Sequence, residues 1–147
     1  MRKKSFRLKL SALVVALTLV IPLPVMAATA TFSNFNFRVS PYEDKTKVVT
    51  SATKADSETN WYYRITSRSG LGTISSGKIM YLEPNYSGGG LGIATPATIS
   101  SETPLNTSLK ASYYGSCPPA HTYSLYAKSN DQYSSSLNAT ISGRFTP

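Results

Sequence analysis

The chain has 147 residues, with 15 lysine and arginine residues, 7 aspartate and glutamate residues and one cysteine. This length allows a single domain with one hydrophobic core, and a lone cysteine excludes an intramolecular disulfide. The formal charge of +8 invites a nucleic-acid interpretation, but that charge is unevenly distributed along the chain.

The first 27 residues have the pattern of a secretory signal peptide. Five basic residues lie among the first nine positions, and an uncharged apolar run follows. Small residues predict cleavage after Ala27, with cleavage after Ala30 as the alternative. An uncleaved membrane anchor is the other interpretation, because Leu10 to Met26 approaches the length of a span. Pro22 and Pro24 favour processing, so we expect a secreted protein, released or loosely wall-associated.

Without residues 1–27, ten basic and seven acidic residues leave a formal charge of +3. No cluster of lysine and arginine survives, so we expect no nucleic-acid partner. Lys45, Lys47 and Lys54 are separated by polar and β-branched residues and predict a solvated strand face. A mild attraction to anionic wall polymers or lipid headgroups stays open.

From Ala28 onward, serine and threonine are abundant and the apolar residues alternate, which indicates strands and no helix. The predicted strands are one around Phe35, Phe37 and Val39, then Lys45–Thr53, Asn60–Arg68, Lys78–Leu82, a weak Ile93–Ile99 interrupted by Pro96, Thr107–Tyr114, His121–Lys128 and a last one from Leu137 to Phe145. A turn at Ser69–Gly72, a mobile loop over Glu83–Gly92 and a polar loop over Ser129–Ser136 separate some of them. Seven or eight short strands predict one all-β domain over residues 28–147, an antiparallel β-sandwich or Greek-key barrel.

The segment Asn60–Arg68 predicts the central strand. Trp61, Tyr63 and Ile65 fall on one face of a period-2 pattern, and Tyr62 and Arg64 fall on the other. Large aromatic side chains bury most of the area in a small domain. We therefore assign Trp61 to the core and expect Tyr62 and Arg64 to point outward.

Two glycine-containing segments resemble ligand-binding motifs only in part. Gly72–Lys78 matches seven positions of a phosphate-binding loop, but Ile79 stands where the motif needs serine or threonine. A strand instead of a helix is predicted to follow. Gly88–Gly92 lacks the strand–turn–helix context of a dinucleotide site. We interpret both as turns or loops.

Cys117 and His121 are the only residues that could form a thiolate–imidazole pair. Pro118 and Pro119 favour an extended chain between them, which separates the two side chains by about 13 Å. A lone histidine also argues against zinc. We predict a free thiol at Cys117, with a Cys117-linked dimer as the alternative.

The acidic residues do not single out a catalytic or metal site. Glu43 and Asp44 lie in one predicted turn, and Asp56 and Glu58 in a polar loop. Glycoside hydrolysis needs two carboxylates across a cleft, and calcium loops have a regular acidic spacing that is missing here. We predict no catalytic residue, cofactor or metal, and a hydrolase is the third functional class.

Tyrosine is the least ordinary part of the composition, with ten residues beside one tryptophan. Aromatic side chains stack on sugars and anchor protein partners, although strands also favour tyrosine for its propensity alone. The outward candidates are Tyr62, Tyr114 and Tyr126. Together with Arg64 they form the predicted binding face.

Three segments carry a resemblance to a known group of proteins. They are FSNFNFRV (32–39), SATKADSETNWYYRIT (51–66) and YAKSNDQYSSSLNATISGRFTP (126–147). With the signal peptide, this layout resembles small exported β-rich proteins of unknown function from Gram-positive bacteria, a group with no assigned catalytic residues to carry over. A more distant resemblance is to small basic secreted bacteriocins that form two-sheet β-sandwiches.

These observations predict a non-enzymatic exported β-sandwich that binds a cell-envelope component or a partner protein. The sequence motivates this expectation by its aromatic content and its lack of a catalytic set. A bacteriocin-like antimicrobial or toxin is the alternative function, since the domain is small and keeps a residual positive charge.

Overall fold

The structure, a computed structural model, describes residues 28–39, 46–86, 92–129 and 137–147. Its strands are β1 (Ala30–Val39), β2 (Thr46–Thr53), β3 (Asn60–Ser69), β4 (Met80–Tyr86), β5 (Ala97–Ile99), β6 (Leu109–Ser112), β7 (Thr122–Ser129) and β8 (Leu137–Thr146). One short 3₁₀ helix covers Ile74–Ser76. Nothing helical in the described ranges is long and apolar enough to cross a bilayer. The predictions for the signal peptide, Lys45, Glu43, Asp44, Gly88–Leu91 and the loop 130–136 lie outside the described residues.

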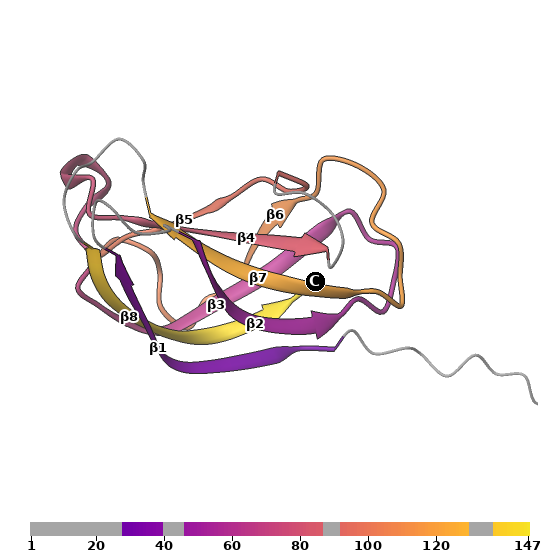
Figure 1. Ribbon diagram of the computed structural model, residues 1–147, viewed down its shortest axis with the longest axis horizontal. Helices are drawn as coiled ribbons and strands as arrows, with labels where there is room; N and C mark the ends of the chain where they lie inside the picture. The colour runs from indigo at the N-terminus through magenta and orange to yellow at the C-terminus, as the bar shows by residue number, and fades with distance from the viewer. Residues whose placement is uncertain (1–27, 40–45, 87–91, 130–136) are drawn as a thin grey trace, which may run out of the picture.

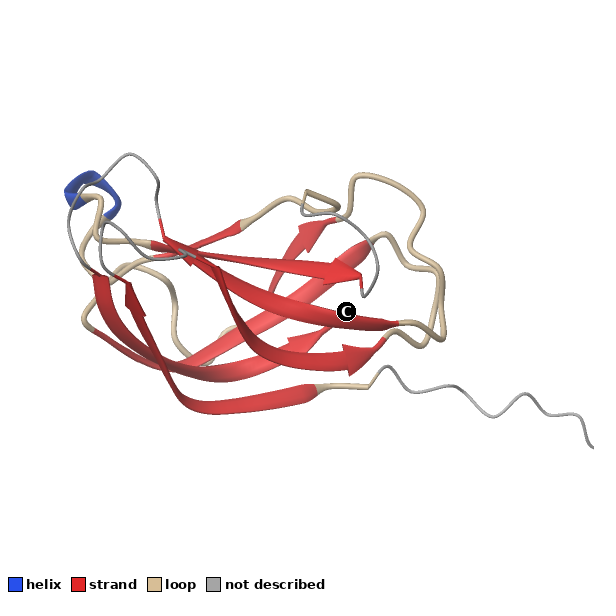
Figure 2. Ribbon diagram, in the orientation of Figure 1, coloured by secondary structure: helices blue, strands red, loops and turns tan. Residues whose placement is uncertain are grey.

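The strands form two four-stranded antiparallel sheets that face each other across the core (Figures 1 and 2). Sheet A has the order β1-β8-β3-β6, and sheet B has the order β2-β7-β4-β5. The edge strands β1 and β2 contact each other along one side of the sandwich (Figure 1). The prediction of an all-β sandwich is confirmed.

The core lies between the sheets and is built from alternate residues of each strand. Trp61 is fully buried, with its ring centroid 5.2 Å from that of Tyr63 and 6.2 Å from that of Phe145. Tyr63 and Ile65 are buried as well. The expected burial of this face of β3 is confirmed, and so is the assignment of Trp61 to the core.

Strands β3 and β8 approach closely at Gly143, which faces Ile65 across the ladder. A Cβ atom at Gly143 would lie 2.3 Å from the backbone oxygen of Arg64 and 2.7 Å from Cζ of Phe32. A side chain has no room there, because these contacts are shorter than van der Waals distance. Glycine therefore allows β8 to lie tightly beside the segment of β3 that carries Arg64.

The predicted loop over Glu83–Gly92 is wrong in its first part. Strand β4 continues to Tyr86, and Glu83, Pro84 and Asn85 all pair with β7. Proline is tolerated where one side of a strand lacks a partner, and β5 pairs only with Met80–Leu82. The weak strand predicted over 93–99 shortens to the three residues of β5, preceded by an isolated bridge at residue 94.

The predicted solvated face at Lys54 is also wrong, although Lys47 is exposed as expected. Lys54 is fully buried, because the segment before β7 folds over it: the Ala120 N–H donates to the Lys54 carbonyl. Its Nζ lies 3.1 Å from Oδ1 of Asp56 and 5.4 Å from the centroid of the Tyr113 ring. An ion pair and a cation–π contact offset the cost of removing this ammonium group from water.

Candidate functional site

The outer face of sheet A carries two arginines side by side. Arg64 of β3 and Arg144 of β8 are direct cross-strand partners. The neighbouring pair, Tyr63 and Phe145, points into the core, so the two arginines point to the outer face. Side chains directly opposite in an antiparallel pair have Cβ atoms about 5 Å apart. We call this region the arginine face and define it by Arg64, Arg144 and the neighbouring Tyr62.

No aspartate or glutamate side chain of the described residues forms an ion pair with Arg64 or Arg144. Asp56 pairs with Lys54 and Glu83 with Lys128, while Glu58 accepts a hydrogen bond from Tyr62 and Glu102 accepts one from the Ile74 N–H. In addition, Nε of Arg64 is buried and has no hydrogen-bond partner in the described part of the chain. The arrangement leaves hydrogen-bond donors and positive charge that the described part of the fold does not use.

A pocket of about 200 Å³ lies at the arginine face. Its lining residues are Thr29, Tyr62, Tyr63, Arg64, Ser108, Arg144 and Thr146. Lys110, which faces Tyr62 in the β3–β6 ladder, is exposed and adds a third positive charge nearby. Guanidinium groups bind phosphate and carboxylate oxygens in a bidentate way, and hydroxyl groups supply further donors. This chemistry suits an anion.

Tyr62 is held at the margin of this pocket by its hydroxyl group. The hydroxyl donates a hydrogen bond to Oε1 of Glu58, and this bond raises the pKa of Tyr62. The same bond fixes the direction of the side chain, whose ring is half-buried in the face. Two of the predicted binding residues, Tyr62 and Arg64, thus line one pocket.

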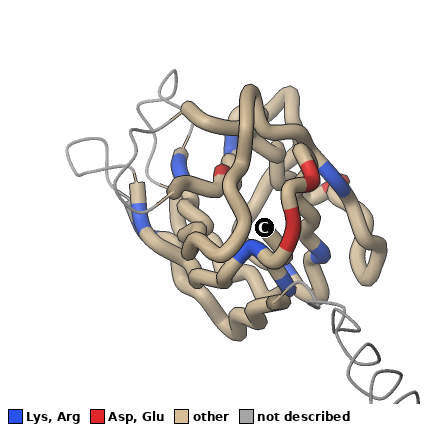
Figure 3. The backbone as a smooth tube through the Cα atoms, turned by 90° about the vertical axis from the view of Figure 1, so that its right-hand side faces the viewer, with Lys and Arg blue, Asp and Glu red and all other residues tan. Residues whose placement is uncertain are grey.

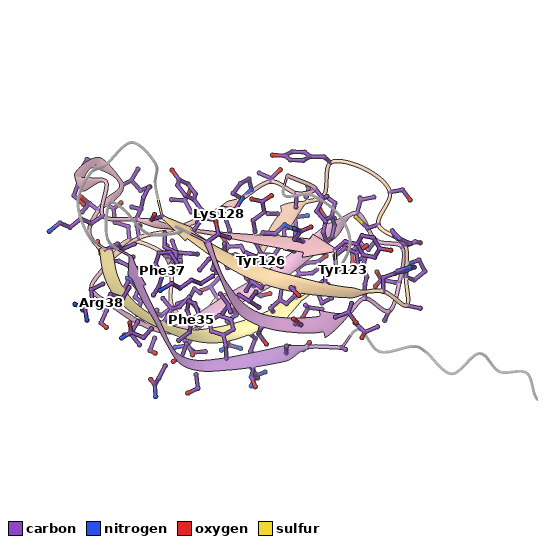
Figure 4. The ribbon with its side chains drawn as sticks, viewed as in Figure 1. Phe35, Phe37, Arg38, Tyr123, Tyr126 and Lys128 are labelled. Carbon is purple, nitrogen blue, oxygen red and sulfur yellow. The ribbon has the colours of Figure 1, made fainter. Side chains whose placement is uncertain are left out.

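The other two predicted residues lie elsewhere. Tyr126 is half-buried on the outer face of sheet B, on β7 between Tyr123 and Lys128 (Figure 4). Tyr114 follows β6 and is 66% exposed. The structure therefore does not bring the four predicted residues together: Tyr126 belongs to sheet B, and Tyr114 lies beyond the end of β6 and lines a different pocket from Tyr62 and Arg64.

Cys117 is a buried free thiol. A free thiol is what the sequence predicts, because the chain has no second cysteine. Burial raises the pKa of Cys117, an effect that the nearby Lys54 ammonium partly opposes. The following segment turns at Pro119 and Ala120, where Ala120 has a φ of 62°, so the expected extended conformation is wrong. The His121 imidazole bonds to the Pro119 carbonyl through Nδ1 at 2.9 Å. His121 therefore has a backbone partner, and burial favours the protonated form of the Cys117 thiol.

The remaining sequence motifs form no metal-ligand group and no phosphate-binding loop in the described residues. Within those ranges no three His, Cys, Asp or Glu side chains gather as a metal site would require. The phosphate-loop-like segment 72–78 forms a short 3₁₀ turn that ends at Gly77, with a φ of 69°, and strand β4 follows. Basic positions are spread around the domain, as the view of its end shows (Figure 3).

Sequence reasoning missed Arg144. Its outward direction follows from the alternation of Ile141, Gly143 and Phe145, but nothing in the sequence reports that it faces Arg64. Their positions are eighty residues apart, and only the pairing of β8 with β3 joins them. Strand order was therefore the missing information.

Comparison of the chain with protein-family models, with curated proteins and with solved structures gives no match.

Proposed function

We propose that this protein is an exported, non-enzymatic β-sandwich that binds an anionic polymer of the cell envelope through the arginine face. One observation carries the proposal: Arg64 and Arg144 are direct neighbours, and no aspartate or glutamate side chain of the described residues forms an ion pair with either. Like charges directly opposite each other destabilise a sheet. A bound anion would remove that repulsion.

The chemistry of the face favours a phosphate-bearing sugar or alditol chain. The two guanidinium groups can grip phosphate oxygens, and the half-buried Tyr62 ring offers an apolar surface to the carbon chain beside them. The signal peptide predicted over residues 1–27 would deliver the domain to an envelope that contains such polymers. Lys110 would extend the contact to a neighbouring phosphate.

The experiment is a calorimetric titration of the purified protein with wall teichoic acid. We expect Arg144→Gln to weaken binding about tenfold, the loss expected for one charge-assisted hydrogen-bonding group. Arg38→Gln is the matched control, since Arg38 is also an exposed arginine on the outer face of sheet A but faces Asn138 at the other end of β8. Added salt should weaken wild-type binding, because screening acts on exposed charges.

Two results would contradict the proposal. The first is equal affinity for teichoic acid and for a neutral glycan of similar length. The second is an equal loss of affinity in Arg38→Gln and Arg144→Gln, which would mean that only net charge matters.

A secreted antimicrobial is the second candidate, supported by the residual charge of +3 on a single small domain. Its test is growth inhibition of related strains by the purified protein. If wild-type protein inhibits growth and Arg144→Gln does not, both proposed functions hold together, because the arginine face would then attach the toxin to its target. Absence of clearing counts against the antimicrobial candidate alone.

A protein partner could also be a second copy, linked through Cys117. The thiol is only 6% exposed, so a disulfide between chains needs the segment around Cys117 to open. A non-reducing gel tests this: a band at twice the monomer mass that vanishes in Cys117→Ser supports the covalent dimer. A monomer band under oxidising conditions contradicts it.

A further inference from the structure

A second pocket lies at the end of the sandwich where β4 ends and β7 begins, and the proposed function does not use it. Its volume is about 450 Å³. We call it the tyrosine pocket; its lining residues are Tyr86, Ile93, Tyr114, Gly115, Ser116, Cys117, Pro118 and Tyr123. Pockets of roughly 300–1,000 Å³ suit small organic ligands.

Two tyrosines of the pocket lining, Tyr86 and Tyr123, belong to a row of aromatic rings in contact with one another. Tyr86 and Tyr123 are cross-strand partners in sheet B, with ring centroids 5.8 Å apart. His121 packs on Tyr86 at 5.1 Å, and Tyr113 packs on Tyr123 at 5.5 Å. Rings that already contact one another are fixed before a ligand arrives, which lowers the entropic cost of binding.

The pocket lining is uncharged, in contrast to the arginine face. None of its lining residues is an acid or a base with an ordinary charge at neutral pH. Burial raises the pKa of Tyr123 to about 12, and its hydroxyl donates to the Pro118 carbonyl at 3.3 Å. The Cys117 thiol donates weakly to the Gly115 carbonyl. A charged ligand would lose hydration here, and the nearby Lys54 ammonium is fully buried and already paired with Asp56.

We propose that the tyrosine pocket binds a small uncharged molecule that carries an aromatic ring. Tyrosine rings prefer such partners in offset or edge-to-face contact. A sugar fits less well, because the Tyr123 and Cys117 donors are already engaged with backbone carbonyls. Tyr114 lines the pocket while 66% of its side chain is exposed, so its ring stands at the mouth.

The test uses N-phenyl-1-naphthylamine, a neutral fluorescent aromatic that has no charge for Arg64 and Arg144 to attract. We expect a saturable rise in fluorescence with one site per chain. Tyr114→Ser should weaken binding about tenfold through loss of one aromatic contact. Tyr126→Ser is the matched control, a tyrosine outside the pocket, and Arg144→Gln should also leave probe binding unchanged.

A pocket-filling variant and the Cys117 thiol give independent measurements. At Gly115 a Cβ atom would meet no heavy atom within 4 Å, so Gly115→Phe should fold while it reduces the pocket volume and the probe affinity. Saturating probe should slow alkylation of Cys117 by N-ethylmaleimide, because the thiol lies in the wall.

Three results would overturn the inference: non-saturable fluorescence, equal probe affinity in Tyr114→Ser and Tyr126→Ser, or alkylation of Cys117 that the probe does not slow. Each is independent of the teichoic acid titration, so the two proposals can fail separately. Thermal melting of every variant distinguishes lost binding from lost folding.

Discussion

Both sheets carry charged side chains on the outer face of their two central strands, but only sheet B pairs opposite charges there. On sheet B, Glu83 and Lys128 lie on the outer face of the central strands β4 and β7 and form an ion pair. Glu83 is 2% exposed and also accepts a hydrogen bond of 2.7 Å from the Gly92 N–H. On sheet A, the central strands place Arg64 beside Arg144, with no such partner among the described residues.

The difference separates charges that stabilise the fold from charges that are free to bind. A carboxylate buried as deeply as Glu83 requires its partners, because an unpaired buried charge is strongly destabilising. Arg144 is exposed and stays hydrated, so the fold tolerates it without a partner. Substitutions on the two faces should therefore have opposite effects on stability and on binding.

The largest expected loss of stability comes from a substitution in the core beneath both faces. Trp61→Ala should lower the free energy of unfolding by about 3–5 kcal/mol, through lost transfer energy and a cavity. Urea denaturation followed by far-ultraviolet circular dichroism measures it without tryptophan fluorescence. Unchanged stability together with lost teichoic acid binding would reverse the assignment of Trp61 to the core.

The second largest loss of stability is expected on the outer face of sheet B. Glu83→Gln should cost about 2–3 kcal/mol, because it weakens charge-assisted hydrogen bonds of a buried group and leaves Lys128 without a counter-charge. Chemical denaturation of the purified variant measures the loss. Glu58→Gln is the control, a carboxylate that is exposed; an equal loss in both variants would contradict the assigned role of Glu83.

The pair between buried Lys54 and half-exposed Asp56 should give a smaller, pH-dependent effect. The Glu58 backbone N–H and then Lys54 hold the pKa of Asp56 below its ordinary value of 3.8. The folded state therefore gains stability from this group above pH 3.8 and loses it as the pH falls toward the folded-state pKa.

Asp56→Asn should remove about 1 kcal/mol at neutral pH and flatten this part of the acid transition. The loss is small for a partner of a buried charge, because water screens the half-exposed carboxylate and the Tyr113 ring still contacts the Lys54 ammonium. Thermal melting between pH 2 and pH 7 checks the slope in both proteins. A variant that melts with the same pH dependence as the wild type would show that Asp56 does not contribute.

The smallest expected effect on stability lies at the arginine face. Arg144→Gln should change the free energy of unfolding by less than about 0.5 kcal/mol, because it removes an exposed charge that faces a like charge. Chemical denaturation of the same preparation used for the teichoic acid titration measures it. A loss as large as that of Glu83→Gln would mean that Arg144 is structural.

Local patterns predicted much of the fold and about half of the candidate site. The alternation in β3 gave the buried direction of Trp61 and the outward direction of Tyr62 and Arg64 correctly, because strand geometry depends only on neighbours in sequence. Arg144 could not be paired with Arg64 in this way. Pairing depends on strand order, which the whole core determines.

The errors at Glu83 and Lys54 have a similar origin. Pro84 and the glycines that follow suggested a loop after Leu82, yet cross-strand contacts with β7 keep residues 83–86 in a strand. Lys54 has a sequence environment typical of an exposed strand, and it is buried only because the segment before β7 covers it. Tertiary contacts override local propensity at both positions.

Strand β8 is the last strand of the chain and lies in the middle of sheet A, between β1 and β3. The earliest strand of the domain thus finds its hydrogen-bonding partner only when the final residues are available. Strands β3 and β6 can pair before β8 exists, but β1 cannot join sheet A earlier, since β1 and β3 have no ladder to each other. Such long-range pairing makes folding slow, on a scale of milliseconds to seconds. Strand β1 therefore has no native ladder until β8 is available, and only then does sheet A acquire its native strand order.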